Sequence, residues 1–145
     1  MSKIFVMVDF DEIFSKAAKD LGCEYILGTL SNVEAKLSDT DISKSNGLIY
    51  VLPVKITPVY FNGLVQYNNY STGVAICRLG NLADGFDTKY RTELKQMTEV
   101  LTAFFKLIGG CSGSITITSL NIEYAANRMS SNLDCVISNL TFKDE

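Results

Sequence analysis

The sequence predicts an α+β domain, in which one long and one shorter helix pack on one face of an antiparallel sheet. Three observations predict this class: an amphipathic helical pattern near the start, an Asn-Gly turn between two long β-type runs, and a longer helical pattern followed by two more β-type runs. The expected order is helix, short helix, strand, strand, long helix, strand, strand. Because 145 residues without an internal repeat suit one compact domain, we expect residues 1–145 to form a single domain.

The first predicted element is a helix from about Phe10 to Leu21, because its apolar residues recur at the three-and-four spacing of one helical face. Asp9 is placed to cap this helix, and Glu12 would complete a capping box. Gly22 follows the last apolar residue, where a left-handed residue ends a helix. Both ends of this helix are therefore encoded locally.

A second, short helix is predicted after an extended segment over residues 23–30. Ser31 with Glu34 suggests its start, and Leu37 is its last apolar residue. A polar connection follows over residues 39–46.

A long β-hairpin is predicted over residues 48–79, with its turn at Asn62-Gly63. Each strand of about 14 residues would extend roughly 45 Å at about 3.3 Å per residue. A domain of this length is only roughly 40 Å across, so a straight hairpin would extend beyond its own domain. Folding the chain about the turn pairs Tyr60 with Val65, Pro58 with Tyr67, and Tyr50 with Ala75.

The two prolines of the chain, Pro53 and Pro58, interrupt the first strand of this hairpin. Their odd spacing points the two missing N–H donors in opposite directions, so one would face the partner strand unless a bulge or bend intervenes. We therefore expect an apolar base, a polar stretch over residues 66–72 and an apolar tip. The part that projects, called the arm below, spans residues 54–72.

The remaining elements are a loop over residues 81–86, a long helix and two closing strands. The helix is expected to start at Asp87 or Thr88 and to reach Ile108, where Gly109-Gly110 would end it. In each closing strand the apolar residues change parity, which indicates a bulge. The changes run from Ile115 and Ile117 to Leu120, Ile122 and Tyr124, and from Leu133, Cys135 and Ile137 to Leu140 and Phe142.

The composition argues against catalysis, cofactor binding and nucleic-acid recognition. The chain has no histidine, which removes the commonest general base and most zinc sites. A net charge of −3 without a Lys/Arg cluster does not suit phosphate binding. The glycine-rich segment 109–113 follows a helix and does not open one, so it offers no phosphate loop. We therefore expect no catalytic residue, cofactor or metal.

The acidic residues near helix starts and turns fit structural roles better than metal binding. Asp9, Asp11 and Glu12 are interpreted as capping and dipole-complementing residues. Asp39 and Asp41 lack the glycine and closing glutamate of a calcium loop, so a solvated turn is expected.

The four cysteines are expected to be free, packed thiols, because they are widely separated and no export signal precedes them. Cys77 precedes Arg78, but adjacent strand residues point to opposite faces, so no basic neighbour activates the thiol. A cysteine-dependent enzyme stays open as a third interpretation. The other three cysteines are Cys23, Cys111 and Cys135. No stretch approaches the roughly 20 apolar residues that span a bilayer, so no membrane is expected as a partner.

The arm is the candidate functional site, because it carries apolar residues on both faces. We expect one face to carry Ile56, Pro58, Tyr60, Val65 and Tyr67, and the other Val59, Phe61 and Leu64. Either the hairpin folds back over its own domain, or a neighbouring subunit covers it. We favour a subunit interface, because exposed apolar patches and open strand edges usually mark interaction sites.

This arrangement resembles the tail terminator, tail completion and head–tail connector (neck) proteins of long-tailed bacteriophages. The resemblance covers nearly the whole chain and lies in the order of elements, without a fixed motif. It is carried by Leu48-Ile49-Tyr50-Val51-Leu52-Pro53, the hairpin into Val74-Ala75-Ile76-Cys77-Arg78-Leu79, the helix Thr88 to Ile108, and the closing Leu133 to Phe142.

The resemblance implies a non-enzymatic virion protein, assembled in the host cytoplasm, that forms a sixfold or twelvefold homo-oligomeric ring at the tail end or the head–tail neck. Its partners would be copies of itself and neighbouring neck or tail proteins. DNA would pass through the ring without sequence-specific binding, which suits a subunit of net charge −3. The alternative is a cytosolic oligomeric adaptor or binding module unrelated to virions.

Overall fold

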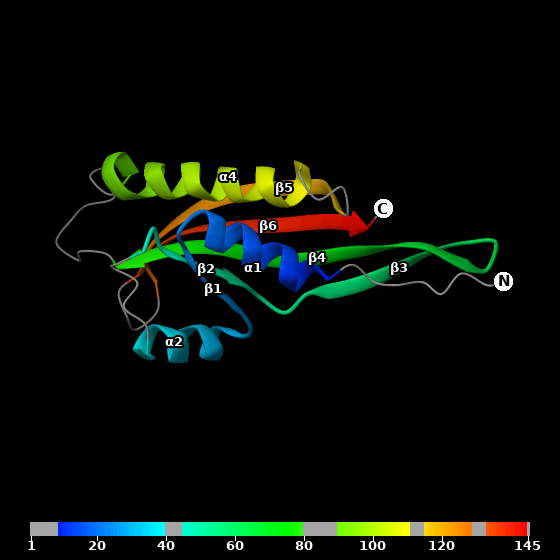
Figure 1. Ribbon diagram of the computed structural model, residues 1–145, viewed down its shortest axis with the longest axis horizontal. Helices are drawn as coiled ribbons and strands as arrows, with labels where there is room; N and C mark the ends of the chain where they lie inside the picture. Colours follow the sequence, from blue (N-terminus) through cyan, green and yellow to red (C-terminus); the bar gives the residue numbers. More distant parts are fainter. Residues whose placement is uncertain (1–8, 40–44, 80–89, 111–114, 129–132, 145) are drawn as a thin grey trace.

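The computed structural model describes residues 9–39, 45–79, 90–110, 115–128 and 133–144, and it confirms the α+β class (Figure 1). A sheet runs the length of the molecule, and its strands are antiparallel except for one pair. The elements are α1 (Phe10–Asp20), β1 (Glu24–Leu27), α2 (Leu30–Asp39), β2 (Leu48–Val51), β3 (Lys55–Phe61), β4 (Leu64–Leu79), the π-helical turn η2 (Tyr90–Leu94), α4 (Lys95–Gly110), β5 (Ile115–Arg128) and β6 (Leu133–Asp144).

The strand order across the sheet is β1-β2-β4-β6-β5, and β3 continues the column of β2 by pairing with β4. β1 pairs in parallel with β2, over four residues. The sequence predicted only extended chain at this position, because four residues give too short a pattern to reveal a partner strand. β1 and β5 form the two edges of the sheet.

The helices cover both faces of the sheet, which corrects the expectation that all of them gather on one face (Figure 1). The long helix α4 and the shorter helix α1 share one face, as predicted, and we call it the α4 face. The other helix, α2, covers the opposite face, where Val33 packs with Leu48, Ala75 and Cys77. We call this the α2 face. The base of the sheet is therefore the middle of three layers.

A cluster of aromatic rings forms the centre of the α4 face. Phe142 of β6 stacks on Tyr70 of β4, with ring centroids 4.7 Å apart and planes inclined by 9°. Phe14 of α1 meets Phe142 at 5.6 Å and Phe104 of α4 at 5.7 Å. Because all four rings are fully buried, this cluster ties both helices to the two central strands.

The helix ends largely follow their local sequence signals. Asp9 accepts a hydrogen bond from the Glu12 N–H at 3.1 Å, and Gly22 takes a φ of +71°, as expected for the start and end of α1. α2 starts earlier than Ser31, because the hydroxyl of Thr29 accepts from the Asn32 N–H at 3.4 Å. The capping residue of α2 is thus Thr29, not Ser31.

α4 continues through Gly110, so Gly109-Gly110 does not end it as predicted. A Cβ at Gly109 would lie 3.3 Å from the side chain of Ile117. Glycine here therefore allows the helix to approach β5 closely. The predicted loop over residues 81–86 and the start of the helix at Asp87 or Thr88 lie outside the described residues.

The two parity changes in the closing strands have different causes. In β5 the register shifts between Ile117 and Ser119, which confirms the predicted bulge. β6 pairs with β4 without a shift over its whole length, so the predicted bulge in β6 is wrong. Its parity changes because α2 covers the face of Cys135, whereas α1 and α4 cover the face of Phe142.

Replacing Phe142 by alanine is expected to lower the free energy of unfolding by about 3–5 kcal/mol, because it leaves a cavity beside the buried rings of Phe14 and Tyr70. Urea unfolding followed by far-ultraviolet circular dichroism measures this loss in a chain without tryptophan. Lys106→Ala on the exposed side of α4 is the control and should change the free energy by no more than about 0.5 kcal/mol. Equal losses in the two variants would contradict the ring cluster as the centre of the core.

Candidate functional site

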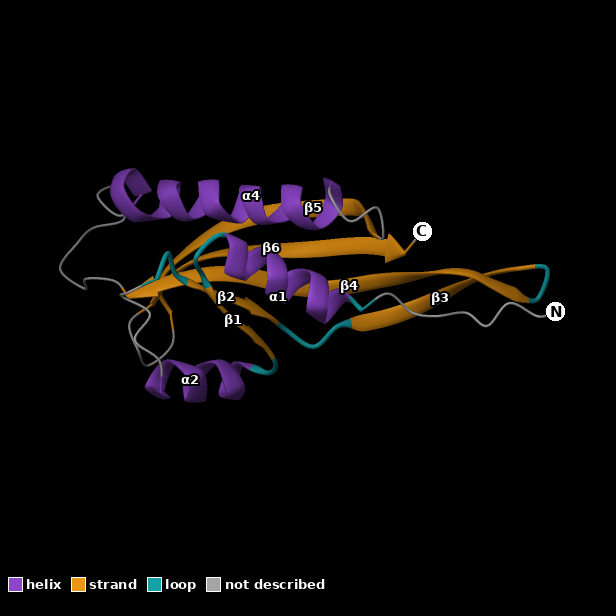
Figure 2. Ribbon diagram, viewed as in Figure 1, coloured by secondary structure: helices purple, strands orange, loops and turns teal. Residues whose placement is uncertain are grey.

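The arm leaves the domain where β4 loses its second partner strand. β4 pairs with β6 from Asn69 to Leu79, whereas the described partner of residues 64–68 is β3 alone. The hairpin therefore continues as a two-stranded ribbon past the end of β6, as Figure 2 shows. We call residues 58–68, at its far end, the arm tip.

Asp144 fixes the point at which the arm leaves the sheet. Its carboxylate accepts a hydrogen bond from the Asn68 N–H at 2.8 Å and another from the Tyr70 hydroxyl at 2.9 Å. Both contacts are buried, so the last residue of β6 closes the β4 edge just where the strand pairing stops.

The turn of the hairpin has the predicted geometry. Asn62 and Gly63 both take positive φ angles, 51° and 78°, as a two-residue Asn-Gly turn requires. The predicted pair of Tyr60 with Val65 is confirmed. So is the pair of Tyr50 with Ala75 at the base of the hairpin.

A bulge lies between these two regions, and it corrects one predicted pair. The register shifts between Val59 and Tyr60, so Pro58 pairs with Asn68, and Tyr67 pairs with Val59. Gln66 is left without a partner in the β3–β4 register. The prediction that the prolines require a bulge or bend is thus confirmed, because residues 52–54 around Pro53 also leave the strand.

The bulge also corrects the two faces of the arm, because it moves Tyr67 to the face of Val59. The register continues the sheet faces into the arm, since Ile56 pairs with the core residue Tyr70. The α4 face of the arm carries Ile56, Pro58, Tyr60 and Val65, and its α2 face carries Val59, Phe61, Leu64 and Tyr67.

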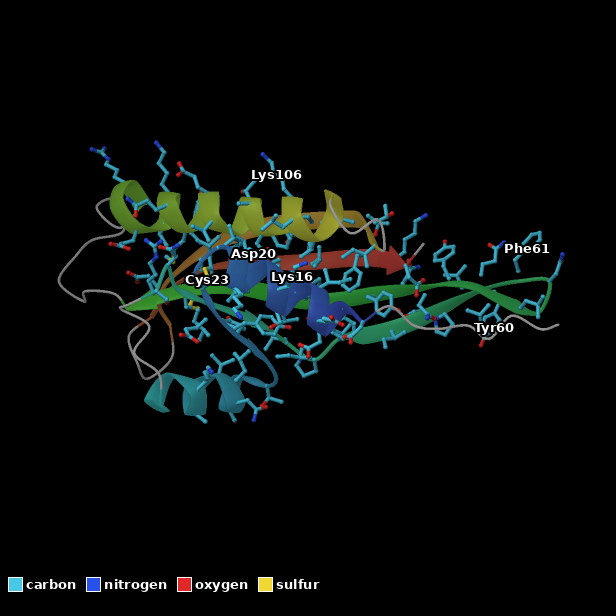
Figure 3. The ribbon with its side chains drawn as sticks, in the orientation of Figure 1. Lys16, Asp20, Cys23, Tyr60, Phe61 and Lys106 are labelled. Atoms are coloured by element: carbon cyan, nitrogen blue, oxygen red, sulfur yellow. The ribbon has the colours of Figure 1, made fainter. Side chains whose placement is uncertain are left out.

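The tip residues on both faces are exposed. The exposed fractions are 63% for Tyr60, 59% for Phe61 and 73% for Leu64, against 39% for Ile56. Figure 3 shows the Tyr60 and Phe61 side chains on opposite sides of the ribbon. Fully burying one such side chain contributes about 1.5–3 kcal/mol. A partner that covers both faces would therefore gain several kcal/mol of binding free energy from this burial.

Val59, Val65 and Tyr67 are only half-buried. The ring of Tyr67 is contacted by the ammonium of Lys143, 5.1 Å from its centroid. This cation–π contact lies at the foot of the arm tip and helps to hold its direction.

An open, mostly polar groove lies on the α2 face at the base of the arm. Its walls carry hydroxyl and amide groups and two lysines, without a nucleophile paired with a base. The lining residues are Lys55, Thr57, Tyr67, Asn69, Tyr70, Ser71, Thr118, Thr141 and Lys143. The groove can therefore accept a polar group.

The acidic residues at the start of α1 have structural contacts. Asp9 caps the helix, and Asp11 accepts a hydrogen bond from the Tyr25 hydroxyl at 2.8 Å. Burial raises the pKa of Tyr25, and the Asp11 hydrogen bond with the charges of Asp11 and Asp9 raises it further. No group of three potential metal ligands occurs among the described residues. The side chain of Asp39 and the whole of Asp41 lie outside them.

No disulfide joins Cys23, Cys77 or Cys135, in agreement with the sequence prediction, while Cys111 lies outside the described residues. Cys77 and Cys135 are buried in the layer beneath α2. Cys23 is half-buried, and its burial raises its pKa from 9.0 to about 11, although the charge of Arg78 acts in the opposite direction. A raised pKa disfavours the thiolate, which is the reactive form.

A second exposed apolar set lies on β5, and the sequence did not reveal it. Leu120 and Ile122 were predicted to be strand residues of one face, but the pattern could not show that α4 leaves them 38% and 39% exposed. Both lie at the edge of the sheet.

Neither a protein-family model nor a curated protein sequence matches this chain. The candidate site therefore rests on its geometry and chemistry. Among the described helices, none is both long and apolar enough to cross a bilayer.

Thiol labelling tests whether a described cysteine is reactive. In a Cys111→Ser variant at pH 8, the remaining three thiols should react slowly, because two are buried and the thiolate fraction of Cys23 is about a hundredfold below that of an ordinary thiol. Absorbance after adding an aromatic disulfide reagent measures the rate, and unfolding in urea should release all three thiols. A fast-reacting thiol in the folded variant at pH 8 would contradict this expectation and support a cysteine-dependent enzyme.

Proposed function

We propose that this protein is a non-enzymatic structural protein that assembles with copies of itself into a ring at the tail end or head–tail neck of a bacteriophage virion. One observation carries the proposal: the arm presents exposed aromatic and aliphatic side chains on both faces, beyond the reach of its own described helices. An apolar ribbon of this kind gains free energy only when another surface covers it.

Self-assembly is favoured because the arm and the rest of the chain offer different surfaces. A contact between an arm and a different region of the next copy is heterologous, and such contacts close into a ring when the rotation divides a full turn. The described residues show no cluster of metal ligands, and the polar groove has no nucleophile–base pair. These features support a structural role over a catalytic one.

The placement in a virion rests on the order of elements. The described chain has an N-terminal helix, a long hairpin, a long helix and a closing strand pair, which is the order that resembles tail terminator and neck proteins. A subunit of net charge −3 also suits the wall of a channel through which DNA passes.

An oligomeric adaptor or binding module is the second candidate. The groove at the base of the arm favours it, because its hydroxyls, amides and two lysines could hold a polar group of a protein or small ligand. A stable dimer in solution, together with absence from purified virions, would support this candidate over the ring.

Sedimentation velocity and negative-stain images of the purified protein test the proposed ring. Closed rings are expected for the native chain. A Tyr60→Ser, Phe61→Ser, Leu64→Ser variant should sediment as a monomer with an unchanged circular dichroism spectrum, because these side chains are exposed and contribute little to the fold.

The matched control replaces three exposed helix residues, Lys16→Ala, Asp20→Ala and Lys106→Ala, which are labelled in Figure 3. This variant should assemble like the native chain. A native protein that stays monomeric at about 100 μM, or an arm variant that still forms rings, would overturn the proposal.

A further inference from the structure

We propose that the open edge of β5, around Leu120 and Ile122, receives the arm of a second copy of this chain. This inference rests on the proposed self-assembly and names the surface that the arm contacts. It begins with the distribution of exposed apolar residues. Among the described residues, the exposed large hydrophobic side chains are Ile56, Tyr60, Phe61 and Leu64 of the arm, Leu120 and Ile122 of β5, and Leu27 of β1.

β5 is the last strand at one edge of the described sheet. It pairs with β6 on one side, and no described strand lies on its other side. The backbone N–H and C=O groups of Leu120 and Ile122 point away from β6, toward this edge. This follows from their neighbour Asn121, because the N–H of its partner Asn139 points at β5, where it donates to the Asn121 side chain at 3.2 Å. In an antiparallel ladder, the residues on either side of such a pair direct their backbone groups the other way.

On the arm, β4 is likewise the one described strand that pairs with β3, so β3 also lies at an edge of the described sheet. Pro58 has no N–H, so its place in the β3–β4 ladder is one where that group would point away from β4. Ile56 and Tyr60, two residues before and after it, then also direct their backbone groups outward. The outward-facing residues of β3 are thus the apolar residues of its α4 face.

Both open edges carry their apolar residues on the same face of the sheet. Leu120 pairs with Leu140 and Ile56 with Tyr70, and both partners belong to the α4-face core. Joining the two edges with the α4 faces on one side therefore brings apolar residues together. A continuous apolar strip would cross the junction.

The directions of β3 and β5 also allow them to pair when the two copies have the same orientation. β5 runs parallel to β4, because both are antiparallel to β6, whereas β3 is antiparallel to β4. β3 and β5 lie on opposite sides of the β4–β6 pair. Two copies placed side by side in the same orientation therefore bring β5 of one against β3 of the other as an antiparallel pair, which is a head-to-tail contact.

One register of the proposed β3–β5 pair also places opposite charges across from each other. If Ile122 lies opposite Ile56 of the partner subunit, then Leu120 lies opposite its Pro58 and Glu123 lies opposite its Lys55. Lys55 is the one charged residue in the arm sequence, and both Lys55 and Glu123 are exposed. Opposite charges directly across a strand pair favour a register, although each pair contributes little energy.

A charge exchange tests this register. Lys55→Glu and Glu123→Lys, each alone, should weaken self-association by about 2- to 30-fold, because like charges then face each other across the strands. The double variant should recover the native association constant within about twofold. Sedimentation equilibrium over a concentration series measures all four proteins at low salt, where exposed charges are least screened.

Ile122→Lys tests the apolar part of the same edge and should abolish assembly while the circular dichroism spectrum stays native. Leu27→Lys is the matched control, because Leu27 is 36% exposed at the opposite edge of the sheet. Rings of native strength in Ile122→Lys, or a double charge variant no better than the singles, would overturn the β5 proposal while the ring itself stands. A native chain that is monomeric at every concentration would overturn both proposals.

Discussion

The structure depends on the length of β4, which belongs to the core over one part and to the arm over the other. Residues 69–79 pair with β6 along one edge, and β3 and β2 pair with parts of the other edge. Residues 64–68 continue the same strand beyond β6. The stacked rings of Tyr70 and Phe142 lie where the core part of β4 passes into the arm. There the Asp144 carboxylate accepts hydrogen bonds from the Asn68 N–H and the Tyr70 hydroxyl. A strand resists bending where it is paired and packed. The buried contacts of Tyr70, Phe142 and Asp144 therefore hold the start of the arm in a fixed direction.

Features encoded within a few residues could be predicted from the sequence, whereas features set by distant partners could not. The Asn62-Gly63 turn and the Asp9 cap follow from backbone geometry at single positions, so the sequence was sufficient for them. The prolines predict a bulge or bend but not its position. Because the extra residue is Gln66 on β4, the predicted face of Tyr67 is wrong. The extended segment of β1 could be predicted, but its parallel pairing with β2 could not, because this pairing joins residues far apart in the chain.

The parity change in β6 is a second feature whose cause lies in distant parts of the chain. Alternating apolar residues report that a face is covered, not what covers it, and here α2 covers Cys135 while the helices of the α4 face cover Phe142. The candidate site followed the same rule. The apolar tip was visible in the sequence, but the exposure of Leu120 and Ile122 depends on how far α4 reaches across β5. An edge without a cover can be recognised only when the whole sheet is known.

Pro58 has a consequence for which symmetry the arm permits. If two β3 edges met about a twofold axis centred on this residue, the central pair would consist of two prolines and would form no hydrogen bond. A symmetric dimer formed by pairing the two β3 edges would therefore lack the hydrogen bonds of its central residue pair. Such a dimer, in which both arms are occupied, is disfavoured. In the proposed contact, by contrast, each subunit would use its arm for one neighbour and its β5 edge for the other, so a chain of subunits would have a direction.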